Sequence, residues 1–172
     1  MIYTENELRI RGAVLDDAEA LVSLLNPIIE AGTTALDTML TVADERDFIA
    51  SLPERAIFLV AVRALDGTLV GCQSVEPFTH GTHAFDHVGV MGTYVDVGYQ
   101  RQGIGRRLFA AIFEQARSKG YEKIFTYVRA DNTAGMAAYL GQGFRVIGTA
   151  ERHAKIHGQY IDEVLIERFL SD

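Results

Sequence analysis

Residues 100–108 read QRQGIGRRL and join an apolar stretch, VGVMGTYV at 88–95, to a helical pattern. Gly103 and Gly105 carry no Cβ, so an anion can approach their backbone closely. The first N–H groups of the helix lack intrahelical acceptors, and the helix dipole favours negative charge there. Arginine side chains within the stretch add cationic donors. The stretch predicts a strand, a phosphate-binding turn and a helix; the alternative is a tight turn with solvated arginines.

Two other glycine-rich phosphate motifs do not fit this stretch. A P-loop requires Lys followed by Ser or Thr after its glycines, and neither pair follows here. The dinucleotide-binding fingerprint requires a third glycine and an early strand, whereas this chain has Phe109 at the third position and the motif comes late. A pyrophosphate on a helix N-terminus is the interpretation that remains.

The rest of the chain alternates strand and helix patterns. Asp16 begins a helix that we expect to end or kink at Pro27, because proline cannot continue the hydrogen bonding. Asp66-Gly67 and His157-Gly158 are the turns of two hairpins. The expected strands are 8–14, 56–62, 68–75, 88–95, 123–130, 144–154 and 159–169, and the expected helices begin near 16, 41, 104 and 133. This order predicts an α/β domain with a mixed sheet.

Composition excludes several classes of protein. The chain has 172 residues, 48% of them hydrophobic, which suits one globular domain over 1–172. A net charge of −7 argues against a nucleic-acid surface. No membrane span and no secretory signal are expected, and the lone Cys72 fits a buried residue in a cytoplasmic protein.

Two motifs together resemble those of the GCN5-related N-acetyltransferase family. The first is the stretch from Gln100 to Gly105, and the second is ADNTAGMAAYLGQGF, whose Asn132 comes 27 residues after Gly105. The first helix, the segment IIEAGTTALDT and the final hairpin are similar to the phosphinothricin-acetyltransferase-like group. The resemblance implies a mostly antiparallel mixed sheet with splayed central strands, 88–95 and 123–129, and helices on both faces.

The resemblance also implies acetyl-CoA as co-substrate, held between the splayed strands, and no metal. Backbone groups of one strand would pair with the pantetheine, and the turn would hold the pyrophosphate. The implied cofactor-binding residues are Thr93, Tyr94, Val95, Arg101, Gln102, Gly103, Ile104, Gly105, Arg106, Asn132 and Tyr139.

Direct attack of an amine on the thioester requires an acid and a base. Tyr139 matches the family's proton donor; a phenol with a pKa of about 10 is protonated at neutral pH. The two glutamates that serve as bases in relatives correspond here to Val90 and Tyr127. Glu76, His83 and His87 remain as candidates, and His87, just before the splayed strand, is expected to be the base or a substrate contact.

The expected reaction is acetyl transfer to the primary amine of a small molecule, an amino acid or an analogue. Thr34, Glu76 and His87 are the expected substrate-binding residues, in a pocket formed with 32–37 and 153–160. Alternatives are a protein or peptide amine acetyltransferase and a non-catalytic acyl-CoA-binding module. Apolar residues in the last hairpin favour a homodimer, among them Ile156, Tyr160 and Ile161. A zinc site at His80, His83 and His87 is disfavoured, because no nearby cysteine completes it.

Overall fold

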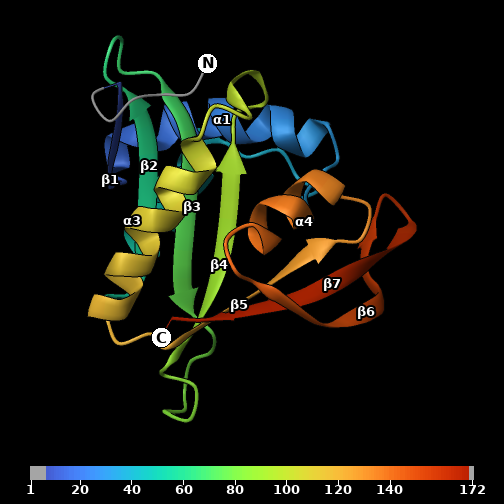
Figure 1. Ribbon diagram of the computed structural model, residues 1–172. Helices are drawn as coiled ribbons and strands as arrows, with labels where there is room; N and C mark the ends of the chain where they lie inside the picture. Colours follow the sequence, from blue (N-terminus) through green and yellow to red (C-terminus); the bar gives the residue numbers. More distant parts are fainter. Residues whose placement is uncertain (1–6, 171–172) are drawn as a thin grey trace.

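The computed structural model describes residues 7–170 and follows the predicted order of elements (Figure 1). The strands are β1 Leu8–Gly12, β2 Ile57–Arg63, β3 Leu69–Pro77, β4 Val88–Val95, β5 Lys123–Arg129, β6 Arg145–Ile156 and β7 Gln159–Phe169. The helices are α1 Ala18–Glu30, α2 Val42–Ser51, α3 Ile104–Ser118 and α4 Thr133–Leu140, with short 3-10 turns at Leu15–Asp17 and Val97–Tyr99. The α/β class predicted from the sequence is confirmed.

The seven strands form one mixed sheet in the order β1-β2-β3-β4-β5-β7-β6. All neighbouring strands are antiparallel except β4 and β5, which are parallel. That parallel pairing covers only Val88 to Val90 against Lys123 to Phe125, although both strands continue further. The central strands therefore diverge after Val90, as the sequence resemblance implied, and Figure 1 shows β4 and β5 separating beside α4.

The helices cover both faces of the sheet. Helix α3 buries Ile104, Leu108 and Ile112 against one face, in a cluster with residues of β2, β3 and β5. Helix α1 buries an apolar stripe against the other face, in a cluster that includes Cys72 of β3. Side chains alternate along a strand, so the parity of each residue decides which face it reaches.

The sequence predicted that helix α1 ends or kinks at Pro27. The helix does not end there and continues to Glu30. Proline removes the bond that its N–H would make to the carbonyl of Ser23. Both residues are exposed, so water can satisfy that carbonyl, while Ile28 and Ile29 are buried and hold the last turn on the sheet.

Helix α2 begins as the sequence predicted. The Thr41 side chain accepts from the Asp44 N–H, and an Asp44 carboxylate oxygen accepts from the Thr41 N–H. This reciprocal pair is a capping box.

Candidate active site

The site lies where β4 and β5 diverge. Beyond the last backbone pair, Val90 with Phe125, one side-chain bond still joins the strands: Thr126 Oγ1 donates to the Met91 carbonyl at 2.7 Å. Further along, β4 pairs only with β3. In an antiparallel ladder the N–H and C=O groups of successive residues point alternately to the two sides. Part of the backbone from Thr93 to Val95 therefore faces the opening rather than a neighbouring strand.

The glycine turn, residues 100–105, follows β4 after the short 3-10 turn Val97–Tyr99 and leads into the N-terminus of α3. Gly103 is the N-cap residue with φ of 82°, and Arg101 also has a positive φ, of 60°. Within residues 7–170, no side chain caps α3, whereas Thr41 and Asn132 cap α2 and α4. The N–H groups at the start of this 15-residue helix are thus left for water or a ligand.

The side chains of the turn have two different environments. Ile104 is 1% exposed and packs in the core, which fixes the helix end against β3. Arg101 and Arg106 are exposed and form no ion pair with a described residue. The Gln102 side chain donates to the Gly98 carbonyl at 3.4 Å. A Cβ built on Gly105 would meet the Val95 side chain at 4.0 Å and no closer atom of the described residues outside the helix's own backbone, so the backbone here is lightly covered. The turn therefore combines a fixed backbone with free cationic side chains.

Tyr139 is buried beside the opening. Its ring packs edge-on against Phe109 and Phe144, with centroid distances of 5.4 and 5.1 Å. Its hydroxyl donates to Thr93 Oγ1 at 2.9 Å. Burial raises the pKa of the phenol, and the Thr93 hydrogen bond opposes that shift only in part. Tyr139 consequently keeps its proton at neutral pH.

Thr93 has a second partner that the sequence did not identify. Gln73 Nε2 donates to Thr93 Oγ1 at 2.8 Å, and the Gln73 side chain is fully buried. A glutamine inside the apolar stretch TLVGCQSV is the sequence signal for this residue. Thr126, the residue that bridges β4 and β5, was also missed, because one threonine in a strand carries no signal of its own.

Asn132 caps α4 and joins it to the α1–α2 connection. Its Oδ1 accepts from the Gly135 N–H at 2.8 Å, and its Nδ2 donates to the Thr33 carbonyl at 3.0 Å. A Cβ on Gly135 would lie 2.7 Å from Asn132 Nδ2, which explains the small residue in this motif. A hollow of about 270 Å³ lies between these segments and is lined by residues 32–33 and 131–134.

The opposite face of the sheet brings Thr34 and Tyr94 together. Burial raises the pKa of the Tyr94 phenol, and the Thr34 side chain lowers it by a smaller amount. Arg129 of β5 donates to the Thr34 carbonyl at 3.3 Å and is held by both carboxylate oxygens of Asp131. The connection after α1 therefore spans the divergence of β4 and β5 on this face.

Glu76 lies on the same face of the sheet, nearer the end where β4 and β5 are still paired. Its Cα is in register with Val90 of β4, and burial raises the pKa of its carboxyl group while His80 lowers it. The side chain is half-buried.

His87 is exposed in the turn before β4. Its carbonyl accepts from the N–H groups of Glu122 and Lys123, which fixes the start of β4 beside β5. His87 precedes Val90 by three residues, about 10 Å of extended chain. The structure therefore places it at the closed end of the strand pair, whereas Thr93 and Tyr139 lie beyond the divergence.

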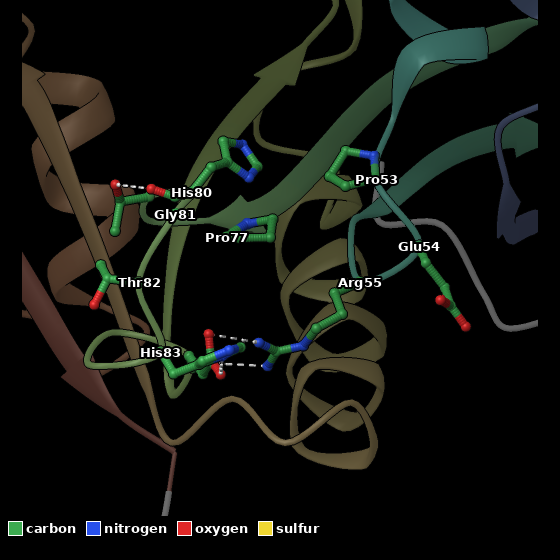
Figure 2. Close-up of a pocket in the computed structure, with 10 residues that line it drawn as sticks. Pro53, Glu54, Arg55, Pro77, His80, Gly81, Thr82 and His83 are labelled. Atoms are coloured by element: carbon green, nitrogen blue, oxygen red, sulfur yellow. Dashed lines mark hydrogen bonds and ion pairs between the residues drawn. The ribbon is translucent and has the colours of Figure 1, made fainter.

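The histidine-containing loop borders a separate hollow of about 490 Å³ under the sheet (Figure 2). His83 Nδ1 lies 2.9 Å from an Asp86 carboxylate oxygen, and Arg55 donates to the Asp86 carbonyl at 2.6 Å.

Among residues 7–170, no group of three or more His, Cys, Asp or Glu side chains is arranged to hold a metal ion. Cys72 is buried, and burial raises the pKa of its thiol, which keeps it protonated. In the same described part of the chain, no helix is both long and apolar enough to cross a membrane.

A sheet that opens between two parallel strands, with an uncapped helix N-terminus beside the opening, is the arrangement expected above for an enzyme of the N-acetyltransferase class. The sequence model of the acetyltransferase (GNAT) family matches residues 24–144, so the chain belongs to that family. This finding confirms the class expected from the two motifs.

Individual relatives are similar over different lengths. The chain is 25% identical over 165 residues to the phosphinothricin N-acetyltransferase of Streptomyces coelicolor, covering 94% of this chain and 96% of the relative. It is 33% identical over 98 residues to the N-alpha-acetyltransferase RimI of Mycobacterium tuberculosis, covering 54% of this chain and only 55% of that relative. A Sinorhizobium meliloti phosphinothricin acetyltransferase, solved in complex with AcCoA, superposes with a TM-score of 0.85 at 18% identity over 95% of this chain and 88% of that one.

Proposed function

We propose that the chain transfers an acetyl group from acetyl-CoA to the primary amine of a small molecule, an amino acid or an analogue. The observation that carries this proposal is the uncapped N-terminus of α3, the next helix after β4, beside the opening between β4 and β5. The similarity to the Streptomyces coelicolor enzyme over nearly the whole chain supports the substrate class.

The residues of the turn fit a pyrophosphate. Gly105 carries no Cβ to obstruct the anion, Gly103 takes a φ of 82° that favours glycine, and the N–H groups from Gly103 to Arg106 would donate to it. Arg101 and Arg106 would add charge-assisted bonds, and Gln102 would border the site. The backbone from Thr93 to Val95 would pair with the pantetheine as an added strand. Asn132 would position the segment beside the cofactor through its cap on α4.

Tyr139 is the proposed acid. The acceptor nitrogen attacks the thioester carbon in a ternary complex, a C–N bond forms, and the C–S bond breaks. A backbone N–H of β4 that faces the opening would donate to the oxyanion. The departing thiolate would take its proton from the Tyr139 hydroxyl, which its raised pKa keeps protonated until that step. His87 is the base expected from the sequence, and Thr34 and Glu76 are the proposed acceptor contacts.

A protein or peptide amine is the second candidate acceptor. The 33% identity to the Mycobacterium tuberculosis N-alpha-acetyltransferase favours it, but over about half of each chain. We place it second because Thr34 and Arg129 connect across the acceptor face, which narrows the space for an extended chain.

The decisive experiment is calorimetric titration of the purified protein with acetyl-CoA, CoA and ATP, followed by a thiol-release screen of amino acids, polyamines and short peptides. Binding of both CoA forms but not ATP, with release for one amino acid or analogue, supports the proposal. Release for peptides alone would move the assignment to the second candidate. Binding without any release would indicate a non-catalytic module, and no binding would refute the pyrophosphate site.

A cytoplasmic location and a homodimer remain predictions. Tyr160 in the β6–β7 hairpin is 58% exposed, while Ile156 and Ile161 are partly buried. Tyr160 is paired with Lys155 and precedes Ile161. An exposed aromatic in this hairpin favours a contact between hairpins of two copies. Light scattering of the wild type and of Tyr160→Glu tests the dimer.

A further inference from the structure

We propose that Glu76, on β3, is the general base that removes the proton from the acceptor ammonium. The inference rests on the proposed function and adds the proton acceptor that the acetyl transfer requires. It depends on where the strand register places this side chain relative to the opening between β4 and β5.

The register puts Glu76 next to the point of divergence. Glu76 is paired with Val90 of β4, and Val90 is paired with Phe125 of β5, the last pair before the strands separate. Directly opposite residues have Cβ atoms about 4.5–5.5 Å apart. The Glu76 carboxylate is therefore one strand away from the closed end of the opening.

Because side chains alternate between the two faces along a strand, Glu76 lies on the face of the sheet opposite Tyr139. Glu76 shares its face of β3 with Cys72, and Val90 shares its face of β4 with Tyr94; Cys72 and Tyr94 belong to the cluster under α1. Thr93, with the other parity, bonds to Tyr139 on the α3 and α4 side. An acid and a base on opposite faces are both able to reach a reacting centre in the opening, because that is where the sheet is interrupted.

The carboxylate of Glu76 is also chemically available. Within residues 7–170 it forms no hydrogen bond or ion pair. The rings of Phe78 and Phe125 meet edge-on on this face, 5.8 Å apart, and make one side of its surroundings apolar. The titratable groups near it are His80, which lowers its pKa, and the phenol of Tyr121. The net shift is upward because of burial, and this makes the carboxylate a stronger base than an exposed one.

With Glu76 as the general base, every proton in the reaction has a donor and an acceptor. The ammonium N–H bond breaks and its proton passes to the Glu76 carboxylate, which leaves a lone pair on nitrogen for attack on the thioester carbon. The tetrahedral adduct collapses with cleavage of the C–S bond, and the thiolate takes the proton of Tyr139. The nitrogen still carries one surplus proton, which returns to the tyrosinate, while Glu76 releases its proton to water. One proton is released in each turnover.

Glu45 and His87 are alternatives for this role. Glu45 of α2 is 4% exposed, has an unpartnered Oε1, and lies near Cys72 on the same face. It has no register relation to the point of divergence. His87 is exposed at the closed end, and its backbone rather than its ring is tied to β5. Glu76 alone of the three is aligned with Val90.

The test is the pH–rate profile of Glu76→Gln, with acetyl-CoA and the amino acid or polyamine that gives the fastest thiol release for the wild type. We expect a loss of about 100-fold or more at pH 7, the usual contribution of a general base. Without the base, the reaction depends on free amine, so the logarithm of the rate should rise with pH at a slope of one. Acetyl-CoA affinity should stay at the wild-type value.

A matched control and a rescue variant make the result specific. Glu54→Gln removes an exposed carboxylate near the same loop, and Figure 2 shows Glu54 extending away from His80 and His83. It should keep the wild-type profile. Glu76→Gln combined with Val90→Glu moves the carboxylate to the paired position on β4, and should recover at least about 10-fold of the lost rate, part of the general-base contribution.

Three outcomes would overturn the inference. They are a Glu76→Gln profile that keeps the wild-type shape, an equal loss at every pH, and a slope of one in Glu45→Gln or His87→Ala instead. Failure of the proposed function is distinct from these, since it would appear as absent thiol release in the wild type.

Discussion

The Tyr139 hydroxyl donates to Thr93 Oγ1 at 2.9 Å and so joins α4 to β4 across the opening between β4 and β5. Thr93 Oγ1 also accepts from the buried Gln73 side chain. A hydroxyl oxygen has two lone pairs, so Thr93 is saturated as an acceptor. The Tyr139 proton therefore has a defined position before any reaction, and transfer to a leaving group requires the phenol to exchange its partner.

Replacing Tyr139 with Phe should lower turnover by about 100-fold, because general acids contribute on that scale. The apolar ring contacts with Phe109 and Phe144 are retained, so folding and acetyl-CoA affinity should change little. Steady-state rates and calorimetric titration measure the two quantities separately. An equal loss of turnover and affinity would show that the phenol serves binding rather than proton transfer.

The raised pKa of the Tyr139 phenol also predicts how the acetyl-transfer rate depends on pH at alkaline values. Burial raises the pKa of Tyr139 above its usual value of about 10, so the group stays protonated as the pH rises through the assay range. The wild-type rate should therefore not fall with pH up to about 10 on account of this residue. A decline centred near pH 8 that disappears in Tyr139→Phe would contradict the raised pKa.

Replacing Gly103 with Val should abolish acetyl-CoA binding. Gly103 has φ of 82°, a conformation that a β-branched residue adopts only with strain, and its backbone faces the proposed pyrophosphate. Gly120, at the other end of α3, also has φ of 82° and provides the matched control. Gly120→Val should lower the melting temperature similarly and leave binding intact. Unchanged affinity in Gly103→Val would refute the pyrophosphate site.

The sequence predicted the elements well because their signals are local. The α2 capping box needs only Thr41 and Asp44, which are three residues apart. Gly103 and Gly105, which mark the start of α3, are likewise close together in the sequence. The helix end that Pro27 allowed does not occur, because burial of Ile28 and Ile29 against the sheet outweighed one missing hydrogen bond. Tertiary packing of this kind is invisible in a local pattern.

The candidate site was predicted only in part. Motif spacing identified Tyr139 and the glycine turn, but strand register decides which side chains meet across the sheet. The pairing of Glu76 with Val90 and the bond between Gln73 and Thr93 join residues far apart in sequence. A one-residue shift of register would send each of these side chains to another partner, and no single strand encodes that choice.

Asp17 should make the protein sensitive to acid. Arg11 binds both carboxylate oxygens, at 2.6 and 2.7 Å, and lowers the pKa of Asp17 below its ordinary value. A lowered folded pKa contributes stability above the unfolded value of about 3.9, and this stability is lost as the pH falls through the folded pKa. Asp17→Asn should reduce the free energy of unfolding by about 1.5–3 kcal/mol at pH 7, the range for hydrogen bonds to charged groups. Urea unfolding at pH 7 and pH 3 measures the effect; a difference between wild type and variant that does not shrink at pH 3 would contradict it.

Asn132 and Gly135 should behave as one structural unit. A Cβ at position 135 would lie 2.7 Å from Asn132 Nδ2, so Gly135→Ala must displace the cap and its bond to the Thr33 carbonyl. Loss of an N-cap costs about 1 kcal/mol, and Asn132→Ala should cost a similar amount. In the double variant the two losses should not add, because the alanine at 135 no longer meets the asparagine side chain. Thermal unfolding of the two single variants and the double variant measures this coupling, with Ala134→Ser as a control in the same first turn. Fully additive losses would mean that Gly135 is required for a reason other than the cap.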